Sequence, residues 1–405
     1  MKSKLIAVAL FTGTVASVAF YPAYKSLGAV TNSPIAAVIP TDSFVSINNT
    51  RPVVEVVFVL DATGSMSGLI QAAKEKIWSI ATTMASAQPA PLIKVGLVAF
   101  RDRGDEYVTK VIDLSSDLDS VYARLMDIRA DGGGDGPESV NQALADAVNK
   151  MSWSTDQKAY KAVFLVGDAA PHMDYQDDVK YPVTLSVARA KGITVNTIQC
   201  GQDAETLREW HQIATLAGGD YFQVDQAGSA VAMTTPFDEK LARLSEKLDG
   251  TRLYYGNKED KEKQALKVAA SDKVHAEASV ESRARRATFN ASASGAANLL
   301  GDGELVEDVT SGRVELGKIN QAQLPATLQA LAPSEQQAKI AETARQRDEL
   351  KKAIGAIADQ RTDYLKREVA KAGGAKDSLD AKLFSTVRAQ AEKKGLHYEA
   401  DAPQY

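Results

Sequence analysis

The chain has 405 residues, enough for one large domain and a second region, and it carries a net charge of −5. This acidic balance argues against nucleic acid as the main partner, because phosphate binding requires a basic surface. The single cysteine, Cys200, excludes an internal disulfide and a thiolate metal cage, and four histidines supply a zinc site poorly. A bound metal would therefore be held by oxygen atoms, which favours Mg²⁺, Ca²⁺ or Mn²⁺.

The amino terminus has the pattern of a secretory signal. Lys2 and Lys4 precede an apolar run over residues 5–20, and residues 17–19 offer a cleavage site. We expect a cleaved signal peptide over residues 1–19. The alternative is an uncleaved anchor, since residues 5–23 are nearly long enough to span a bilayer. Either way the protein is expected outside the cytoplasm, periplasmic or secreted, and it would contact the membrane only if the segment is uncleaved. Residues 20–51, rich in Pro, Ser, Thr and Asn, are expected to form a linker.

An apolar run over residues 53–60 is typical of a strand buried on both faces of a parallel sheet. It leads into a turn with Asp61, Thr63 and Ser65, and a helical period of apolar residues follows over 69–84. Such strand-to-helix turns lie at the carboxyl edge of a parallel sheet, where ligands bind. The alternative is that Asp61 and Ser65 only cap the helix.

Strands and helices then alternate to about residue 249. Further strands are predicted over 92–100, 107–114 (a more polar edge strand), 162–166, 193–200 and 221–224. Helices are predicted over 118–128 and 205–217. One more helix is expected to begin at Pro137, as its first-turn proline, and another to end at Gly192. The pattern predicts an α/β fold over residues 52–249, a doubly wound and mostly parallel sheet covered on both faces.

Residues 250–405 are predicted to form a helical carboxyl-terminal region. Residues 259–297 are alanine-rich and free of proline, and a helix begins at 333–337, with Ser334 and Gln337 at capping-box spacing, and runs to about residue 369. Its heptad pattern suggests a coiled coil, but Arg347 and Arg361 fall in one core column, which argues against a long free-standing one. The helix is instead expected to pack on its own region, on the sheet domain or on a partner.

Three turns with oxygen-bearing side chains recur along the chain. They carry Asp61, Thr63 and Ser65; Asp135 after the glycines of 132–134; and Asp168 after the strand at 162–166. Parallel strands bring such turns to one edge of the sheet, and the glycines allow close backbone approach. Carboxylates, hydroxyls and water are the ligands of a hard divalent cation. These five residues are therefore the predicted metal site.

These motifs resemble the von Willebrand factor type A domain and its metal-ion-dependent adhesion site. The family motif Asp-x-Ser-x-Ser stands here as Asp61-Ala62-Thr63-Gly64-Ser65, Asp135 fills the position of the family's second-loop threonine, and Asp168 matches the third-loop aspartate. The residue sequences of these three motifs also resemble a bacterial branch of the family, some members of which carry a helical carboxyl-terminal tail. Aspartate at 135 adds a carboxylate, which would weaken the pull of the cation on an acidic ligand and shift preference toward Ca²⁺.

Other candidates are given structural roles. We expect His172 to be a surface loop residue, Glu138 to interact with the start of its own helix, and Cys200 to be a small core residue. Asp102 and Asp105, beside Arg101 and Arg103, suggest a surface ion-pair cluster.

The resemblance and the oxygen site together imply a binding module. We expect an exported, non-enzymatic protein-interaction domain with a divalent cation, Mg²⁺ first and Ca²⁺ or Mn²⁺ as alternatives, that reaches a protein partner through an acidic side chain of that partner. One alternative is a metal-dependent hydrolase in the cell envelope with His172 as base. The other is a structural envelope protein in which the metal stiffens the loops.

Overall fold

The computed structural model describes residues 51–134, 136–225, 233–371 and 379–398, and all of these lie in one compact unit, Thr50–Tyr405. The signal segment predicted over 1–19 and most of the linker predicted over 20–51 lie outside the described residues. Among the helices of the described ranges, none combines the length and the apolar character needed to cross a membrane.

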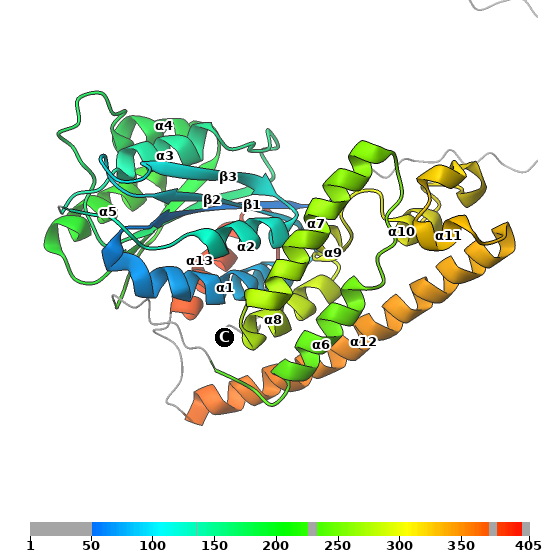
Figure 1. Cartoon of the computed structure of the whole chain (residues 1–405). Helices are drawn as coiled ribbons and strands as arrows, with labels where there is room; N and C mark the ends of the chain where they lie inside the picture. The colour runs from blue at the N-terminus through cyan, green and yellow to red at the C-terminus, as the bar shows by residue number, and fades with distance from the viewer. Residues whose placement is uncertain (1–50, 135, 226–232, 372–378, 399–405) are drawn as a thin grey trace, which may run out of the picture. The chain divides into compact units, whose positions relative to one another are not determined.

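A six-stranded sheet in the order β3-β2-β1-β4-β5-β6 forms the centre (Figure 1). Every neighbouring pair is parallel except β2 and β3, which are antiparallel at the edge. The predicted fold class, a doubly wound and mostly parallel sheet followed by a helical region, is confirmed. The strands are β1 (Val53–Asp61), β2 (Leu92–Phe100), β3 (Thr109–Ser115), β4 (Tyr160–Gly167), β5 (Ile193–Cys200) and β6 (Tyr221–Val224).

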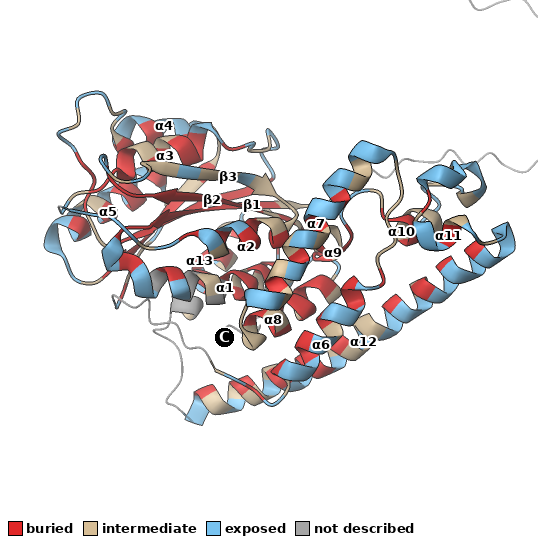
Figure 2. Cartoon of the chain, in the orientation of Figure 1, coloured by how far each residue is buried: buried red, intermediate tan, exposed pale blue. Residues whose placement is uncertain are grey.

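Both faces of the sheet are buried, as the apolar strand runs predicted. Along β1, Val56 and Phe58 face one core while Val57 and Val59 face the other, because successive side chains of a strand point to opposite faces. Helices α3 (Val140–Asn149), α4 (Tyr181–Ala190) and α5 (Ala204–Ala217) cover the second face. Helices α1 (Ser67–Ala85) and α2 (Leu118–Asp127) cover the first. Figure 2 shows β1 and β2 almost entirely buried between these layers, whereas the edge strand β3 is only partly buried.

Helices from the carboxyl-terminal region complete the first core. Phe289 packs against Trp78 of α1 with the two rings tilted and 5.9 Å between ring centroids, and Leu383, Phe384 and Val387 join the same apolar cluster. The boundary predicted at residue 249 stays a prediction, but the helices beyond it contribute to the core of the sheet. Of these helices, α7 (Lys258–Glu277), α8 (Val280–Ala291) and α13 (Leu379–Glu392) supply residues to this core. The others after the last strand are α6 (Asp238–Asp249), α9 (Ala296–Leu300), α10 (Leu305–Thr310), α11 (Ala326–Gln329) and α12 (Pro333–Lys371).

A buried ionic cluster joins the two regions. Arg286 of α8 is 0% exposed and donates to both carboxylate oxygens of Asp119 in α2, each at 2.6 Å. Its guanidinium also lies 2.8 Å from Asp249 at the end of α6 and donates to Ser245 at 2.7 Å. One side chain therefore connects the helical layer under the sheet to two helices of the carboxyl-terminal region.

The long helix α12 packs within the chain, on the side of α6, α8 and α10. One stripe of α12 is buried and the rest exposed (Figure 2). Arg347 makes two hydrogen bonds of 3.0 and 2.8 Å to Glu304, and Arg361 donates to Asp238 at 2.6 Å. The two heptad arginines thus lie buried against carboxylates of the same chain, because a buried charge is stable only when it is paired.

One predicted helix start is wrong and one predicted cap is misplaced. The helix expected from Pro137 begins at Val140, because residue 138 forms a parallel bridge with Pro171 instead. The helix expected to begin at 333–337 does begin at Pro333, but the capping contact lies two residues before the expected Ser334 and Gln337: the backbone N–H of Ala332 donates to Glu335 at 2.8 Å.

Candidate metal centre

The first predicted turn is assembled by local hydrogen bonds. Asp61 is 1% exposed, and its Oδ1 accepts from the backbone N–H of Thr63 at 2.9 Å and from the Thr63 hydroxyl at 2.6 Å. The hydroxyls of Thr63 and Ser65 lie 3.3 Å apart. The buried Oδ2 of Asp61 has no hydrogen-bond partner among the described residues. One carboxylate oxygen is therefore held in place, while the other has no hydrogen-bond partner among the described residues.

The sheet register places Asp168 beside Asp61. Leu60 of β1 pairs with Val166 of β4, so the two strands reach their carboxyl ends together. A Cβ on Gly167 would lie 2.9 Å from Asp61 Cβ and 3.0 Å from its Oδ2. The Asp168 loop is in turn anchored to α5, where Thr206 donates to the carbonyl of Asp168 at 3.1 Å. The expectation that strand ends bring these two loops to one edge agrees with this geometry.

The glycine turn approaches the first turn through its backbone. Gly64 N–H donates to the carbonyl of Gly132 at 3.1 Å, and Gly132 and Gly133 have φ of +78° and +77°. A side chain at Gly132 would be strained by this φ and would collide with the Asp105 carboxylate. Asp135 itself lies outside the described residues. Its part in the site stays a prediction.

Glu138 is a site residue that local sequence did not identify. It is 4% exposed, its Oε2 is buried without a hydrogen-bond partner among the described residues, and it does not cap its own helix. Its backbone is bound to the third loop: its N–H donates to Ala170 at 2.9 Å, and its carbonyl accepts from His172 at 3.0 Å. The only sequence signal was its position three residues after Asp135, in the same turn.

Burial and mutual repulsion change the acidity of these carboxyl groups. Burial raises the pKa of Asp61 to about 7; hydrogen bonds from Thr63 oppose this change, and the charge of Asp168 adds to it. Burial raises the pKa of Glu138 to about 9, with further contributions from the charges of Asp61, Asp102, Asp105 and Asp168. Carboxylates crowded in this way favour a cation among them, because it would offset their repulsion.

The chemistry of the donor set fits a hydrated divalent cation. Among the described residues, no group of three or more His, Cys, Asp or Glu side chains is placed to hold a metal directly. The described members of the predicted set are two carboxylates, Asp61 and Asp168, and the hydroxyls of Thr63 and Ser65. Such a set leaves coordination positions for water, as Mg²⁺ prefers.

Two predictions about the neighbouring residues are wrong. His172 is buried, not on the surface: its Nδ1 lies 2.8 Å from Asp174, its Nε2 lies 3.4 Å from Asp102, and Tyr175 stacks on its ring at 4.0 Å. Asp102 is also buried, and it accepts from Ser139 at 2.7 Å and from Tyr175 at 2.6 Å. Arg103 pairs with two other carboxylates, Asp177 and Asp178. Cys200 is a buried core residue, as expected.

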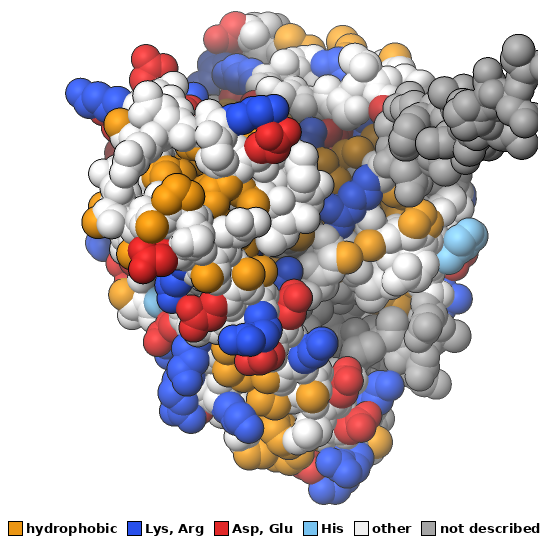
Figure 3. All heavy atoms as spheres, turned by 90° about the vertical axis from the view of Figure 1, so that its right-hand side faces the viewer, with side chains coloured by type: hydrophobic (Ala, Val, Ile, Leu, Met, Phe, Trp, Pro, Cys, Tyr) orange, Lys and Arg blue, Asp and Glu red, His pale blue; other side chains and the backbone are white. Residues whose placement is uncertain are grey.

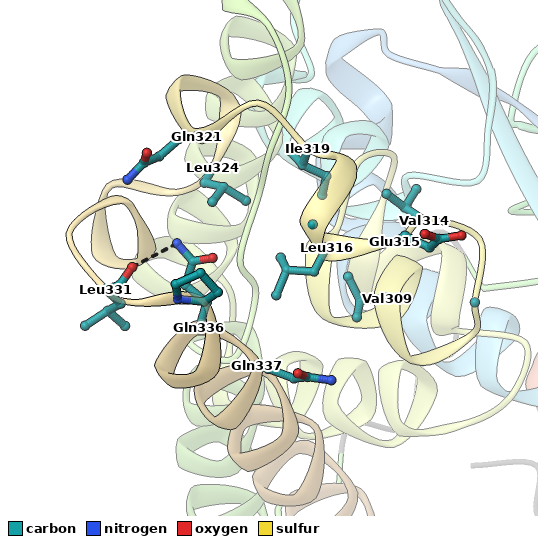
Figure 4. A pocket seen from close by; sticks show the side chains of 13 residues that line it. Val309, Val314, Glu315, Leu316, Ile319, Gln321, Leu324, Leu331, Gln336 and Gln337 are labelled. Carbon is teal, nitrogen blue, oxygen red and sulfur yellow. Dashed lines mark hydrogen bonds between the residues drawn. The ribbon is translucent and has the colours of Figure 1, made fainter.

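A second candidate is a cavity of about 630 Å³ in the helical region, between α10 and the start of α12 (Figure 4). Apolar side chains such as Leu316, Ile319 and Leu324 line it, and Glu315 is the one charged residue among the described residues around it. Gln336 is already bonded to the carbonyls of Leu328 and Leu331. On this side of the molecule, basic and acidic side chains are interspersed around hydrophobic ones (Figure 3). The cavity therefore provides fewer charged groups for binding a specific ligand than the sheet edge does.

Comparison with known proteins gives structural similarities and one family. A crystal form of proximal thread matrix protein 1 from the mussel byssus is 16% identical, covers 44% of this chain and 42% of its own, and has a TM-score of 0.34. The same protein with a zinc-occupied MIDAS motif is 17% identical, covers 43% of this chain and 42% of its own, and has a TM-score of 0.34. The SpRpn10 VWA domain is 11% identical and covers 43% of this chain and 89% of its own, with a TM-score of 0.34.

The match thus spans less than half the length of the mussel protein. No curated protein sequence matches the chain. Residues 55–235 match the family model of the von Willebrand factor A domain, so the resemblance seen in the three loop motifs is confirmed for this part of the chain.

Proposed function

We propose that this protein is an exported protein-interaction module that binds its partner with the help of a divalent cation at Asp61, Thr63, Ser65, Asp135 and Asp168. The observation that carries the proposal is the Asp61 carboxylate, which is held by Thr63 on one oxygen and buried without a partner on the other. A cation at this edge would satisfy that oxygen and face outward, where a partner could complete its coordination. Domains of this family commonly mediate protein–protein contacts, which supports a binding role for residues 55–235.

The hydrolase alternative receives less support. Metal-assisted hydrolysis needs a general base within reach of a metal-bound water. Both ring nitrogens of His172 face carboxylates, and Tyr175 covers its ring. Its geometry is that of a packed structural residue, so we favour binding over catalysis. Export rests on residues 1–19, and cell fractionation with determination of the mature amino terminus would test it.

Calorimetric titration of Mg²⁺, Mn²⁺ and Ca²⁺ into the purified protein tests the cation site. Asp61→Ala and Asp168→Ala should each abolish binding while the circular dichroism spectrum stays that of the wild type, because neither carboxylate side chain belongs to the hydrophobic clusters on the two faces of the sheet. Asp156→Ala is the matched control: this exposed aspartate precedes the opposite end of β4 and should leave affinity unchanged. A wild-type protein that takes up none of these cations would refute the proposal.

The same variants test the interaction role. A pull-down from cell-envelope extract is run with divalent metal and repeated with a chelator. A partner should be retained by wild type and by Asp156→Ala only in the presence of metal, and lost with Asp61→Ala. Retention of the same proteins in the presence of chelator would show that binding does not depend on the cation.

A further inference from the structure

We propose that Glu138 is an outer-shell member of the cation site, whose carboxylate accepts hydrogen bonds from water bound to the cation. This inference rests on the proposed cation site and adds a residue that lies outside its predicted ligand set. Its starting point is the unpartnered Oε2 of a side chain that is only 4% exposed. A buried carboxylate oxygen without a partner is costly, so the molecule must supply one in its working state.

The surroundings of Glu138 identify what that partner is. A Cβ built on Gly133 would lie 3.1 Å from Thr63 Cβ and 3.4 Å from Glu138 Oε1, so the two side chains border the same small space. The absence of a side chain at Gly133 keeps that space open. Among the neighbouring charges, that of Asp61, whose Oδ2 also lacks a partner among the described residues, has the largest effect on Glu138. Two buried carboxyl groups that repel each other and each have an unpartnered oxygen favour a cation with its waters over any neutral group.

No basic side chain pairs with Glu138 among the described residues. Arg101, at the end of β2, donates to the carbonyls of Ala62 and Arg129 and approaches Glu106 at 3.7 Å. A cation that partners the Glu138 carboxylate would therefore have to come from outside the described part of the protein.

A water-mediated role is consistent with the arrangement of the carboxylates. The described residues include no group of three acidic or histidine side chains close enough to share a metal directly. Water bridges this gap, because a small divalent cation keeps several of its own waters. The backbone bonds of Glu138 to Ala170 and His172 also fix it to the loop that carries Asp168. A cation held in this way would join all three loops.

The test is calorimetric titration of Mn²⁺ and Mg²⁺ into wild type, Glu138→Gln, Glu138→Asp and Asp61→Asn. Glu138→Gln should weaken cation affinity by about 10- to 100-fold, the usual effect of losing an outer-shell partner. Glu138→Asp keeps the charge but shortens the side chain by one methylene group, so the loss of cation affinity should be smaller than in Glu138→Gln. Asp61→Asn should abolish binding.

Thermal unfolding gives a second readout that separates the proposed role from a structural one. In chelator, Glu138→Gln should melt at a higher temperature than wild type, because a buried and repelled carboxyl group is removed. At saturating Mn²⁺ this order should reverse. The matched control is Glu55→Gln, a fully buried glutamate of the same strand as Asp61 that pairs with Lys94 at 3.1 Å. Glu55 lies at the other end of β1 from Asp61, roughly 20 Å away along the strand at about 3.3 Å per residue.

Glu55→Gln should destabilise the protein with and without metal and leave cation affinity within twofold of wild type. If wild type binds cation and Asp61→Asn does not, but Glu138→Gln binds as tightly as wild type, the role of Glu138 is refuted while the cation site stands. If wild type itself binds no cation, both proposals fail. A Glu138→Gln variant that melts lower than wild type in chelator would also overturn the inference.

Discussion

Replacing Arg286 by methionine should destabilise the whole chain, because this buried side chain pairs directly with two buried carboxylates, Asp119 and Asp249. In the wild type it donates two 2.6 Å hydrogen bonds to Asp119 and lies 2.8 Å from Asp249. Arg286 and Asp119 are both 0% exposed. Arg286→Met preserves much of the apolar stem but leaves two buried carboxylates without their common counter-charge.

The expected loss follows from the degree of burial. Removing one partner of a fully buried ion pair costs about 3–5 kcal/mol, since the remaining charge stays desolvated. Asp249 keeps some compensation from His275 at 2.8 Å and Arg252 at 3.8 Å, whereas the Asp119 carboxylate keeps a hydrogen bond from Ser271 at 3.2 Å and the electrostatic influence of Lys267 and Arg252. We therefore expect a loss of about 3 kcal/mol or more, which is at least two powers of ten in the folding equilibrium.

Urea unfolding followed by tryptophan fluorescence measures this loss directly. Trp78 is a suitable reporter because it is buried and lies against Phe289, three residues after Arg286. The control is Arg243→Met, which breaks an ion pair with Glu239 in which both side chains are 65% exposed; it should cost about 1 kcal/mol or less. If Arg286→Met were no more destabilising than this control, the cluster would not hold the two regions together.

Three further predictions concern acid, the metal and the last helix. Burial alone would raise the pKa of Asp119, but the charge and hydrogen bonds of Arg286, together with the charges of Lys267 and Arg252, outweigh it and hold that pKa below its usual range. The stability gained is present above the unfolded pKa of about 3.9 and is lost as the pH falls below it, so the unfolding free energies of wild type and Arg286→Met should converge in acid. Asp135→Thr should weaken cation affinity and, at saturating metal, strengthen binding of an acidic partner; equal calorimetric affinities would remove Asp135 from the site. Phe384→Ala in α13 should lower the free energy of unfolding by about 3–5 kcal/mol, because Phe384 is 5% exposed in the first core; a loss below about 1 kcal/mol in a urea titration would contradict this packing.

The sheet and most of its helices could be predicted from local sequence. Strands β2, β5 and β6 have the predicted limits, and β1 differs by one residue, because a buried parallel strand is an uninterrupted apolar run bounded by turn residues. The positions of Asp61 and Asp168 followed from the same pattern, since each comes directly after such a run. The spacing of apolar residues indicates which faces of a strand or helix are buried, and it can be read from a short stretch of the sequence.

The partners of buried charges were decided only by the tertiary structure. Arg347 was recognised as a poor coiled-coil core residue, but its partner Glu304 is 43 positions away along the chain. Asp102 looked like a surface residue beside two arginines, yet Ser139 and Tyr175 enclose it. Glu138 looked like a first-turn acid until its backbone was found bound to the loop after β4. A charged side chain is placed by whichever distant group offsets its desolvation, and that choice depends on register and helix packing, which no local pattern encodes.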